Sequence, residues 1–152
     1  MKVLAVASVG GHWIQLLRLT PVFEGQEVIF VSTKASFAAT VPDHSFYTIP
    51  DGSRKNPLVL LKSFKALISI IMKEQPEVLI STGAAPGLLA LICGRIFKKK
   101  TIWVDSVANV EQLSMSGKIA SKFVSHVYTQ WPNLAQGRIK YAGSVLSKDQ
   151  NL

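Results

Sequence analysis

The sequence predicts an α/β fold in which a parallel sheet carries helices on both faces. Short apolar runs alternate along the chain with segments of helical periodicity. Two of these runs, Lys2–Ser8 and Glu77–Thr82, end in turns of small residues that lead into a helix. This alternation is typical of a parallel sheet, and 152 residues are enough for one domain with its own core.

Seven runs are predicted as strands. The first is a continuous run rich in Val and Ala, which is the pattern of a strand covered on both faces. The others are short and lead into polar, proline-containing or small-residue segments. In chain order, the expected strands are Lys2–Ser8, Glu27–Ser32, Ser45–Ile49, Glu77–Thr82, Thr101–Asp105, His126–Gln130 and Ile139–Ala142.

Four segments between these strands are predicted as helices. The first places Gln15 and Arg18 on one side and is ended or kinked by Pro21. The third is opened by the small-residue turn Gly83–Gly87, and the fourth follows a polar stretch. In chain order, the expected helices are Trp13–Leu19, Leu58–Lys73, Leu88–Phe97 and Ile119–Val124.

Two of these helices carry basic residues beside apolar surface. On the second, lysines repeat along one narrow face, and the apolar arc is wider than packing on one sheet face requires. This pattern fits a helix at a membrane surface, and it fits equally a helix that covers the sheet with its lysines in water. The third helix is apolar until its basic end, so it is either buried, which is the default, or partly embedded in lipid. The residues considered for membrane association are Lys62, Lys65, Lys73, Arg95, Lys98, Lys99 and Lys100.

The composition limits the classes of function. A formal net charge of +8 points to a polyanionic partner, which is an anionic membrane, a phosphate-bearing ligand or nucleic acid. The single cysteine, Cys93, excludes an intramolecular disulfide, and the scattered histidines give no spacing for a metal site. No signal peptide is recognised, and no apolar run approaches the ~20 residues that span a bilayer. We therefore expect a protein that is peripheral on the cytoplasmic face of a membrane.

The glycine turn after the first strand is a candidate phosphate-binding element. The amides of Gly10 and Gly11 lie near a helix N-terminus, and Gly83 and Ala84 repeat this arrangement after the fourth strand. A nicotinamide cofactor is not expected, because the second strand leads into Lys34 where a dinucleotide-binding fold needs an acidic residue. The glycine spacing also differs from the dinucleotide pattern.

Four segments carry a resemblance to one family, and they are Ser8–His12, Ser81–Pro86, Trp103–Lys118 and Gln130–Pro132. They resemble the amino-terminal half of a two-domain GT-B glycosyltransferase that is made as a separate chain. The similarity is to the membrane-associated subunit of the eukaryotic dolichol-linked N-acetylglucosaminyltransferase and to its bacterial exopolysaccharide and capsule counterparts. The peptidoglycan MurG-type enzyme is a single-chain cousin. Asp105 stands where the eukaryotic subunit has a glutamate, and Asn109 stands where it has an arginine.

The resemblance implies a Rossmann-like acceptor-side domain over residues 1–152 and a division of labour between two chains. In GT-B enzymes the carboxyl-terminal domain mainly binds the nucleotide-sugar donor, while the amino-terminal domain faces the acceptor. A small partner subunit is therefore expected to bind the UDP-sugar donor, with no further cofactor. The expected acceptor is a lipid-(pyro)phosphate-linked saccharide, which suits an apolar, positively charged surface at an anionic leaflet.

Inverting sugar transfer needs a base for the acceptor hydroxyl, and positive charge or amide dipoles for the departing nucleoside diphosphate. His12 is the first candidate base, because histidine titrates near neutrality and the matching histidine of MurG-type turns suggests the same role. Alternatively, His12 has a structural role and forms a hydrogen bond within the turn. Asp105 and Glu111 are second candidates, and either can instead cap a helix or bind backbone amides. Substrate contacts are predicted for Gly10, Gly11, Arg54, Gly83, Ala84, Ser106 and Lys118.

Two other functions compete with an acceptor-side glycosyltransferase subunit. The first is a non-catalytic membrane anchor that stabilises a partner glycosyltransferase complete by itself. The second is a small nucleic-acid-binding domain, which is disfavoured because the lysines cluster beside apolar faces and no recognised nucleic-acid motif is present.

Overall fold

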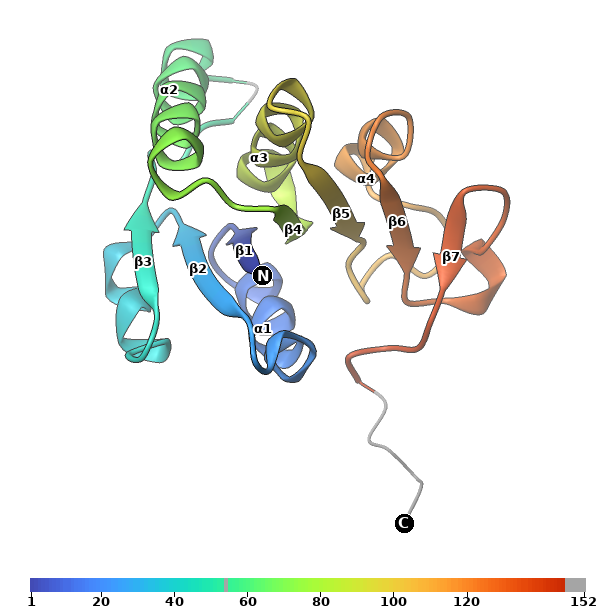
Figure 1. Ribbon diagram of the computed structural model, residues 1–152. Helices are drawn as coiled ribbons and strands as arrows, with labels where there is room; N and C mark the ends of the chain where they lie inside the picture. Colours follow the sequence, from blue (N-terminus) through green and yellow to red (C-terminus); the bar gives the residue numbers. More distant parts are fainter. Residues whose placement is uncertain (54, 147–152) are drawn as a thin grey trace.

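The computed structural model describes residues 1–53 and 55–146, over which seven strands form one sheet (Figure 1). All neighbouring strands pair in parallel, in the order β3-β2-β1-β4-β5-β6-β7. The strands are β1 (Lys2–Ala7), β2 (Glu27–Ser32), β3 (Ser45–Thr48), β4 (Val78–Gly83), β5 (Lys100–Val104), β6 (His126–Thr129) and β7 (Ile139–Tyr141). The predicted α/β fold with a parallel sheet is confirmed.

Helices cover the two faces of the sheet unequally. One face carries α2 (Pro57–Glu74), α3 (Ala84–Ile96) and α4 (Met115–Ala120). The other face carries α1 (Gly11–Arg18) and the 3₁₀ turns η1 (Thr20–Phe23) and η2 (Ala35–Thr40). A third 3₁₀ turn, η3 (Pro132–Leu134), follows β6.

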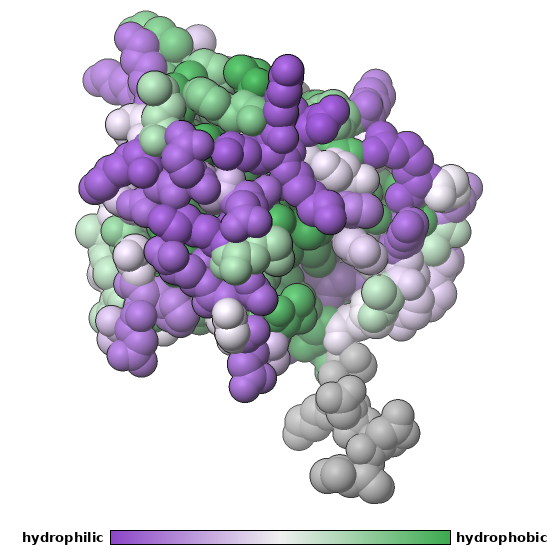
Figure 2. All heavy atoms as spheres, in the orientation of Figure 1, coloured by the Kyte–Doolittle hydropathy of each residue, from purple (hydrophilic) through white to green (hydrophobic). Residues whose placement is uncertain are grey.

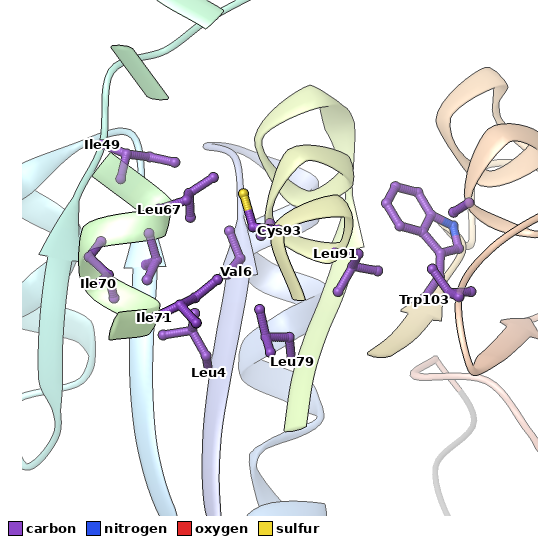
Figure 3. Close-up of a cluster of buried hydrophobic side chains, with 14 of the residues drawn as sticks. Leu4, Val6, Ile49, Leu67, Ile70, Ile71, Leu79, Leu91, Cys93 and Trp103 are labelled. Atoms are coloured by element: carbon purple, nitrogen blue, oxygen red, sulfur yellow. The ribbon is translucent and has the colours of Figure 1, made fainter. Parts of the chain in front are cut away.

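Alternation along the strands divides the core into two layers, because successive strand residues point to opposite faces of a sheet. In β1, Leu4 and Val6 pack toward α2 and α3, where Ile71 is fully buried (Figure 3). Ala5 of the same strand packs in the other layer, with Trp13 of α1. Every residue of β1 after the first is therefore buried, as the continuous apolar run predicts.

The strand order places a topological switch between β1 and β4. From β1 the chain moves outward to β2 and β3, and it then returns through α2 to pair β4 on the other side of β1. In open parallel sheets of this kind, ligands bind outside the carboxyl ends of the strands that flank the switch. The two small-residue turns noted in the sequence follow these two strands.

Two helix boundaries differ from the predictions. The third helix was expected at Leu88 after a turn over Gly83–Gly87, but α3 begins at Ala84, because Gly83 and Ala84 complete the turn with φ angles of 146° and 65°. The fourth was expected near Ile119–Val124, but α4 begins at Met115 and its end lies at Ala120. The side chain of Ser114 caps α4 by accepting a hydrogen bond from the amide of Gly117. This cap sets where the helix begins, upstream of the apolar residues of Ile119–Val124 on which the prediction was based.

The surface of α2 combines lysines with exposed apolar side chains. Leu58, Leu61 and Met72 are 73%, 50% and 59% exposed. Figure 2 shows a largely hydrophilic face, with a group of apolar side chains at its upper left, where α2 lies in Figure 1. The predicted excess of apolar surface on this helix is therefore present. Within residues 1–53 and 55–146, no helix combines the length and apolar character needed to cross a bilayer.

The single cysteine lies in the core between α3 and the sheet. Cys93 is fully buried, and burial raises the pKa of its thiol to about 11. The side chain is a packing residue, as expected for a buried thiol that stays protonated at neutral pH.

Candidate functional site

His12 occupies the first turn of α1, directly above the carboxyl end of β4. Its Nδ1 lies 3.2 Å from the carbonyl oxygen of Thr82, and Oγ1 of Thr82 donates a hydrogen bond of 2.6 Å to the carbonyl of His12. A carbonyl oxygen only accepts, so Nδ1 carries the hydrogen in this contact. In the neutral ring, Nε2 then keeps its lone pair and is available to accept a proton.

The β4–α3 turn is shaped around the imidazole. A Cβ at position 83 would overlap the ring of His12, so only glycine allows this close approach. Ala84 follows with a φ of 65°, which is rare for a residue other than glycine. Predicted site residues from both switch-point strands are thus brought together at one place.

Two helix N-termini flank His12 without side-chain caps. The N-cap residues of α1 and α3 are Gly10 and Gly83, and within the described chain neither helix has a side-chain cap or an acidic residue in its first turn. By contrast, Asn56 caps α2 and Ser114 caps α4. The amide of Gly83 itself donates to Oγ of Ser81 at 3.1 Å and is not free for a ligand. The amides that follow the two N-caps lie at the positive end of a helix dipole, which is an anion-binding arrangement.

Gly11 leaves open space beside these amides. A Cβ built there would have no described heavy atom within 4 Å outside its immediate chain neighbours, and its φ lies outside the positive range. Neither steric contact nor positive φ therefore requires glycine at this position. The open space can be filled by a ligand that approaches the backbone closely.

Asp105 is engaged differently from the prediction of a catalytic base. The residue is 1% exposed, and its carboxylate accepts four hydrogen bonds, from the Trp103 indole, the Asn109 amide, and both the backbone and the hydroxyl of Ser114. These donors fill the capacity of a carboxylate. Asp105 therefore organises the segment between β5 and α4. This is the alternative role given above, in which the carboxylate binds backbone amides instead of acting as a base. Its catalytic role stays a prediction.

The remaining predicted substrate and catalytic residues are spread along this segment and beyond it. Ser106 is buried, and its hydroxyl accepts hydrogen bonds from Gln15 and from the amide of Ala108. Glu111 is exposed. Lys118 is exposed and donates a hydrogen bond of 2.7 Å to the side chain of Gln112. Arg54 lies outside the described residues.

The basic residues proposed for membrane association separate into two groups. Helix α2 joins the carboxyl end of β3 to the amino end of β4, so Lys62 and Lys65 lie toward the edge that carries His12. Lys73 lies at the other end of α2, where its ammonium is 5.4 Å from the ring centre of Tyr47. The remaining members, Arg95, Lys98, Lys99 and Lys100, also lie at or beyond the C-terminal end of α3, toward the amino edge.

Sequence reasoning missed a pair of buried glutamines. Gln15 was expected on a polar side of the first helix, but it is 7% exposed and hydrogen-bonded to Gln130, which is 4% exposed. The signal available in the sequence was the position of Gln15 between apolar neighbours. Its partner could not be identified, because the two residues are 115 positions apart.

A groove lies on the less covered face of the sheet. Its volume is about 610 Å³, and α1, η1, β4, β5 and β6 together with Ala142–Val145 line it. Among the described residues, no group of three or more His, Cys, Asp or Glu side chains is placed to hold a metal ion.

The fold and the site define a class of protein. The chain is a Rossmann-like domain of the type that forms the amino-terminal half of GT-B glycosyltransferases. MurG of Acinetobacter baumannii superposes with a TM-score of 0.78 at 16% sequence identity, covering 97% of this chain and 46% of MurG. A UDP-N-acetylglucosamine 2-epimerase of Rickettsia bellii gives a TM-score of 0.71 at 14% identity, covering 96% of this chain and 45% of the epimerase.

The chain belongs to the family described as "Oligosaccharide biosynthesis protein Alg14 like", whose model matches residues 48–145. Curated relatives are named UDP-N-acetylglucosamine transferase subunit Alg14. The Schizosaccharomyces pombe relative is 39% identical over 101 residues, which are 59% of this chain and 47% of that protein. The Yarrowia lipolytica relative is 31% identical over 91 residues, which are 53% of this chain and 41% of that protein. The mouse relative is 24% identical over 180 aligned positions, which cover 95% of this chain and 81% of that protein. The chain therefore matches less than half the length of the two fungal relatives.

Proposed function

We propose that this chain is the acceptor-side subunit of a two-component glycosyltransferase. It acts with a small partner subunit that binds a UDP-sugar, and the acceptor is a saccharide linked to a lipid (pyro)phosphate. The observation that carries this proposal is the pair of uncapped helix N-termini with His12 between them. Relatives named as transferase subunits and the likeness to half of MurG support a site completed by a second chain.

The proposed chemistry is inverting transfer of the sugar. Nε2 of His12 removes the proton of the acceptor hydroxyl as its oxygen attacks the anomeric carbon of the donor. The bond from that carbon to the nucleoside diphosphate breaks, and the diphosphate leaves with the electron pair. A positioned general base of this type contributes about 10²- to 10⁴-fold to the rate. The phosphates of the acceptor are proposed to bind the amides at Gly11 and Ala84, and the absence of side-chain caps at these two described helix N-termini supports this.

The proposed membrane contact lies on the amino-terminal half of α2. Leu58 and Leu61 are exposed beside Lys62 and Lys65, at the edge of the sheet that carries His12. Apolar side chains flanked by lysines suit an anionic lipid surface, and each lysine near such a surface contributes about 1 kcal/mol. In this proposal, a lipid-linked acceptor in that membrane lies next to the site. The cytoplasmic face of the membrane is the proposed location.

The test is reconstitution with a small subunit that binds UDP-sugars, which is the partner that this proposal requires. The two purified subunits, separately and mixed, are assayed for sugar transfer from UDP-sugars to a lipid-pyrophosphate saccharide in anionic vesicles. We expect activity only in the mixture, and a loss of about 100-fold in kcat for His12→Asn with the complex intact. Unchanged turnover in this variant would exclude His12 as the base and would favour the alternative function of a non-catalytic membrane anchor. Transfer by the partner alone at the full rate would exclude the proposed function.

A further inference from the structure

A run of buried hydrogen bonds links the segment after β6 to the segment after β5. The side-chain nitrogen of Gln130 donates to the carbonyl of Asp105 at 3.0 Å and to Oε1 of Gln15 at 2.8 Å. Its side-chain oxygen accepts the amide hydrogen of Val145 at 2.9 Å. Both glutamines are more than nine-tenths buried. Gln130 therefore joins α1, the end of β5 and the segment after β7.

Gln15 extends these bonds into the loop that follows β5. Its Oε1 also accepts the amide hydrogen of Val107 at 3.0 Å, and its Nε2 donates to Oγ of Ser106 at 3.1 Å. Two further side chains bind the same loop, since the Trp131 indole donates to the carbonyl of Val107 at 2.7 Å and Asn133 donates to that of Val110 at 2.9 Å. The loop from residue 106 to 113 contains no helix or strand, so these bonds, together with those to Asp105, supply its shape.

Backbone partners fix the direction of both amides. A carbonyl only accepts and a backbone N–H only donates, so the nitrogen of Gln130 must face Asp105 and its oxygen must face Val145. The oxygen of Gln15 must likewise face Val107. Its nitrogen therefore faces Ser106, whose hydroxyl accepts two hydrogen bonds. A flip of either side chain would leave buried polar groups without partners, which is costly.

We propose that Gln15 and Gln130 are positioning residues that hold the loop of residues 106–113 in the shape that binds the acceptor. This inference rests on the proposed function, because the loop follows β5 at the same sheet edge as His12 and carries Glu111, an exposed candidate catalytic residue. Neither glutamine needs to touch the substrate. Their loss weakens binding of the acceptor, while binding of the UDP-sugar by the partner subunit is unaffected.

The variants Gln130→Leu and Gln130→Glu test this role. Leucine removes every hydrogen bond, and glutamate keeps the size but turns an oxygen toward the carbonyl of Asp105. We expect amide hydrogen exchange across residues 106–113 and 144–145 to become about tenfold faster in both variants. In the complex with the partner, the KM for the lipid-linked acceptor rises about tenfold, while the KM for the UDP-sugar stays within about twofold.

Thr101→Val is the matched control. Thr101 is fully buried and accepts the amide hydrogen of Ser125 at 3.0 Å, but it lies in β5 toward the opposite edge of the sheet. The control loses buried hydrogen bonds without touching the loop, so its loop exchange and acceptor KM remain those of the wild type. If Gln130 variants do not fold, Gln15→Met replaces them, with the same expected exchange and KM.

The two proposals fail in different ways. An active complex whose loop exchange or acceptor KM is unchanged by the glutamine variants overturns the positioning role alone. A control that shifts the acceptor KM as much as the glutamine variants also overturns it. A wild-type complex with no transferase activity overturns the proposed function, and the positioning role with it.

Discussion

His12 and Asp105 lie at the carboxyl edge of the same sheet, but their surroundings differ. The imidazole makes a hydrogen bond through Nδ1 to Thr82 and is only half buried, and within residues 1–53 and 55–146 no hydrogen bond engages its Nε2. The carboxylate is buried and accepts four hydrogen bonds, from Trp103 of β5, from Asn109 of the following loop and from Ser114 at the start of α4. A reactive group needs unused hydrogen-bonding capacity, while a group that shapes a loop uses its capacity within the protein. Substitutions in the two regions should therefore have different consequences.

Asp105→Asn has the largest expected effect on stability. Each carboxylate oxygen accepts two hydrogen bonds, so the amide nitrogen that replaces one oxygen faces two donors. Two buried hydrogen bonds are lost, and donor groups are left facing one another. We expect the free energy of unfolding to fall by about 3 kcal/mol, measured by urea denaturation. A variant as stable as the wild type would contradict the assignment of Asp105 as the group that organises its loop.

Gly83→Ala tests the other region by steric overlap. The added methyl group overlaps the His12 ring and must also adopt a φ of 146°. We expect a loss of about 2 kcal/mol in the free energy of unfolding, together with a shift in the imidazole NMR resonances of His12. Gly11→Ala is the matched control, because the same methyl group there meets open space. Equal destabilisation by both changes would show that the ring does not lie against Gly83.

Tyr47→Phe gives the smallest of these effects, at the end of α2 remote from both groups. The Tyr47 hydroxyl donates to Glu74 and, together with Lys2, lowers the pKa of that carboxyl below its usual value. A lowered pKa stabilises the fold above the unfolded-state value and loses this contribution as the pH falls through the folded-state value. We expect a cost of about 1 kcal/mol at pH 7 that shrinks toward zero as Glu74 is protonated. Thermal unfolding across this pH range measures it, and a cost independent of pH would contradict the assignment.

The sequence was sufficient for the sheet and for the turns at its switch point. Those predictions depend on local signals: the apolar runs of the strands and the glycines that follow β1 and β4. The role of Asp105 was not predictable, because a carboxylate at a strand end has the same local pattern whether it meets substrate or four protein donors. The Gln15–Gln130 contact was not predictable either, because its members approach only when α1 and β6 pack beside the same loop.

The catalytic constants of two His12 variants test whether this imidazole is the base. Asparagine can keep the hydrogen bond from the Nδ1 position to the carbonyl of Thr82 while removing Nε2, so His12→Asn separates the proposed base from the structural contact. In the intact two-subunit complex, we expect kcat of the His12→Asn variant to fall about 100-fold while its stability stays that of the wild type. His12→Ala, which removes both groups, should lose at least as much kcat and some stability. A His12→Asn complex that retains the wild-type kcat would show that His12 is not the base.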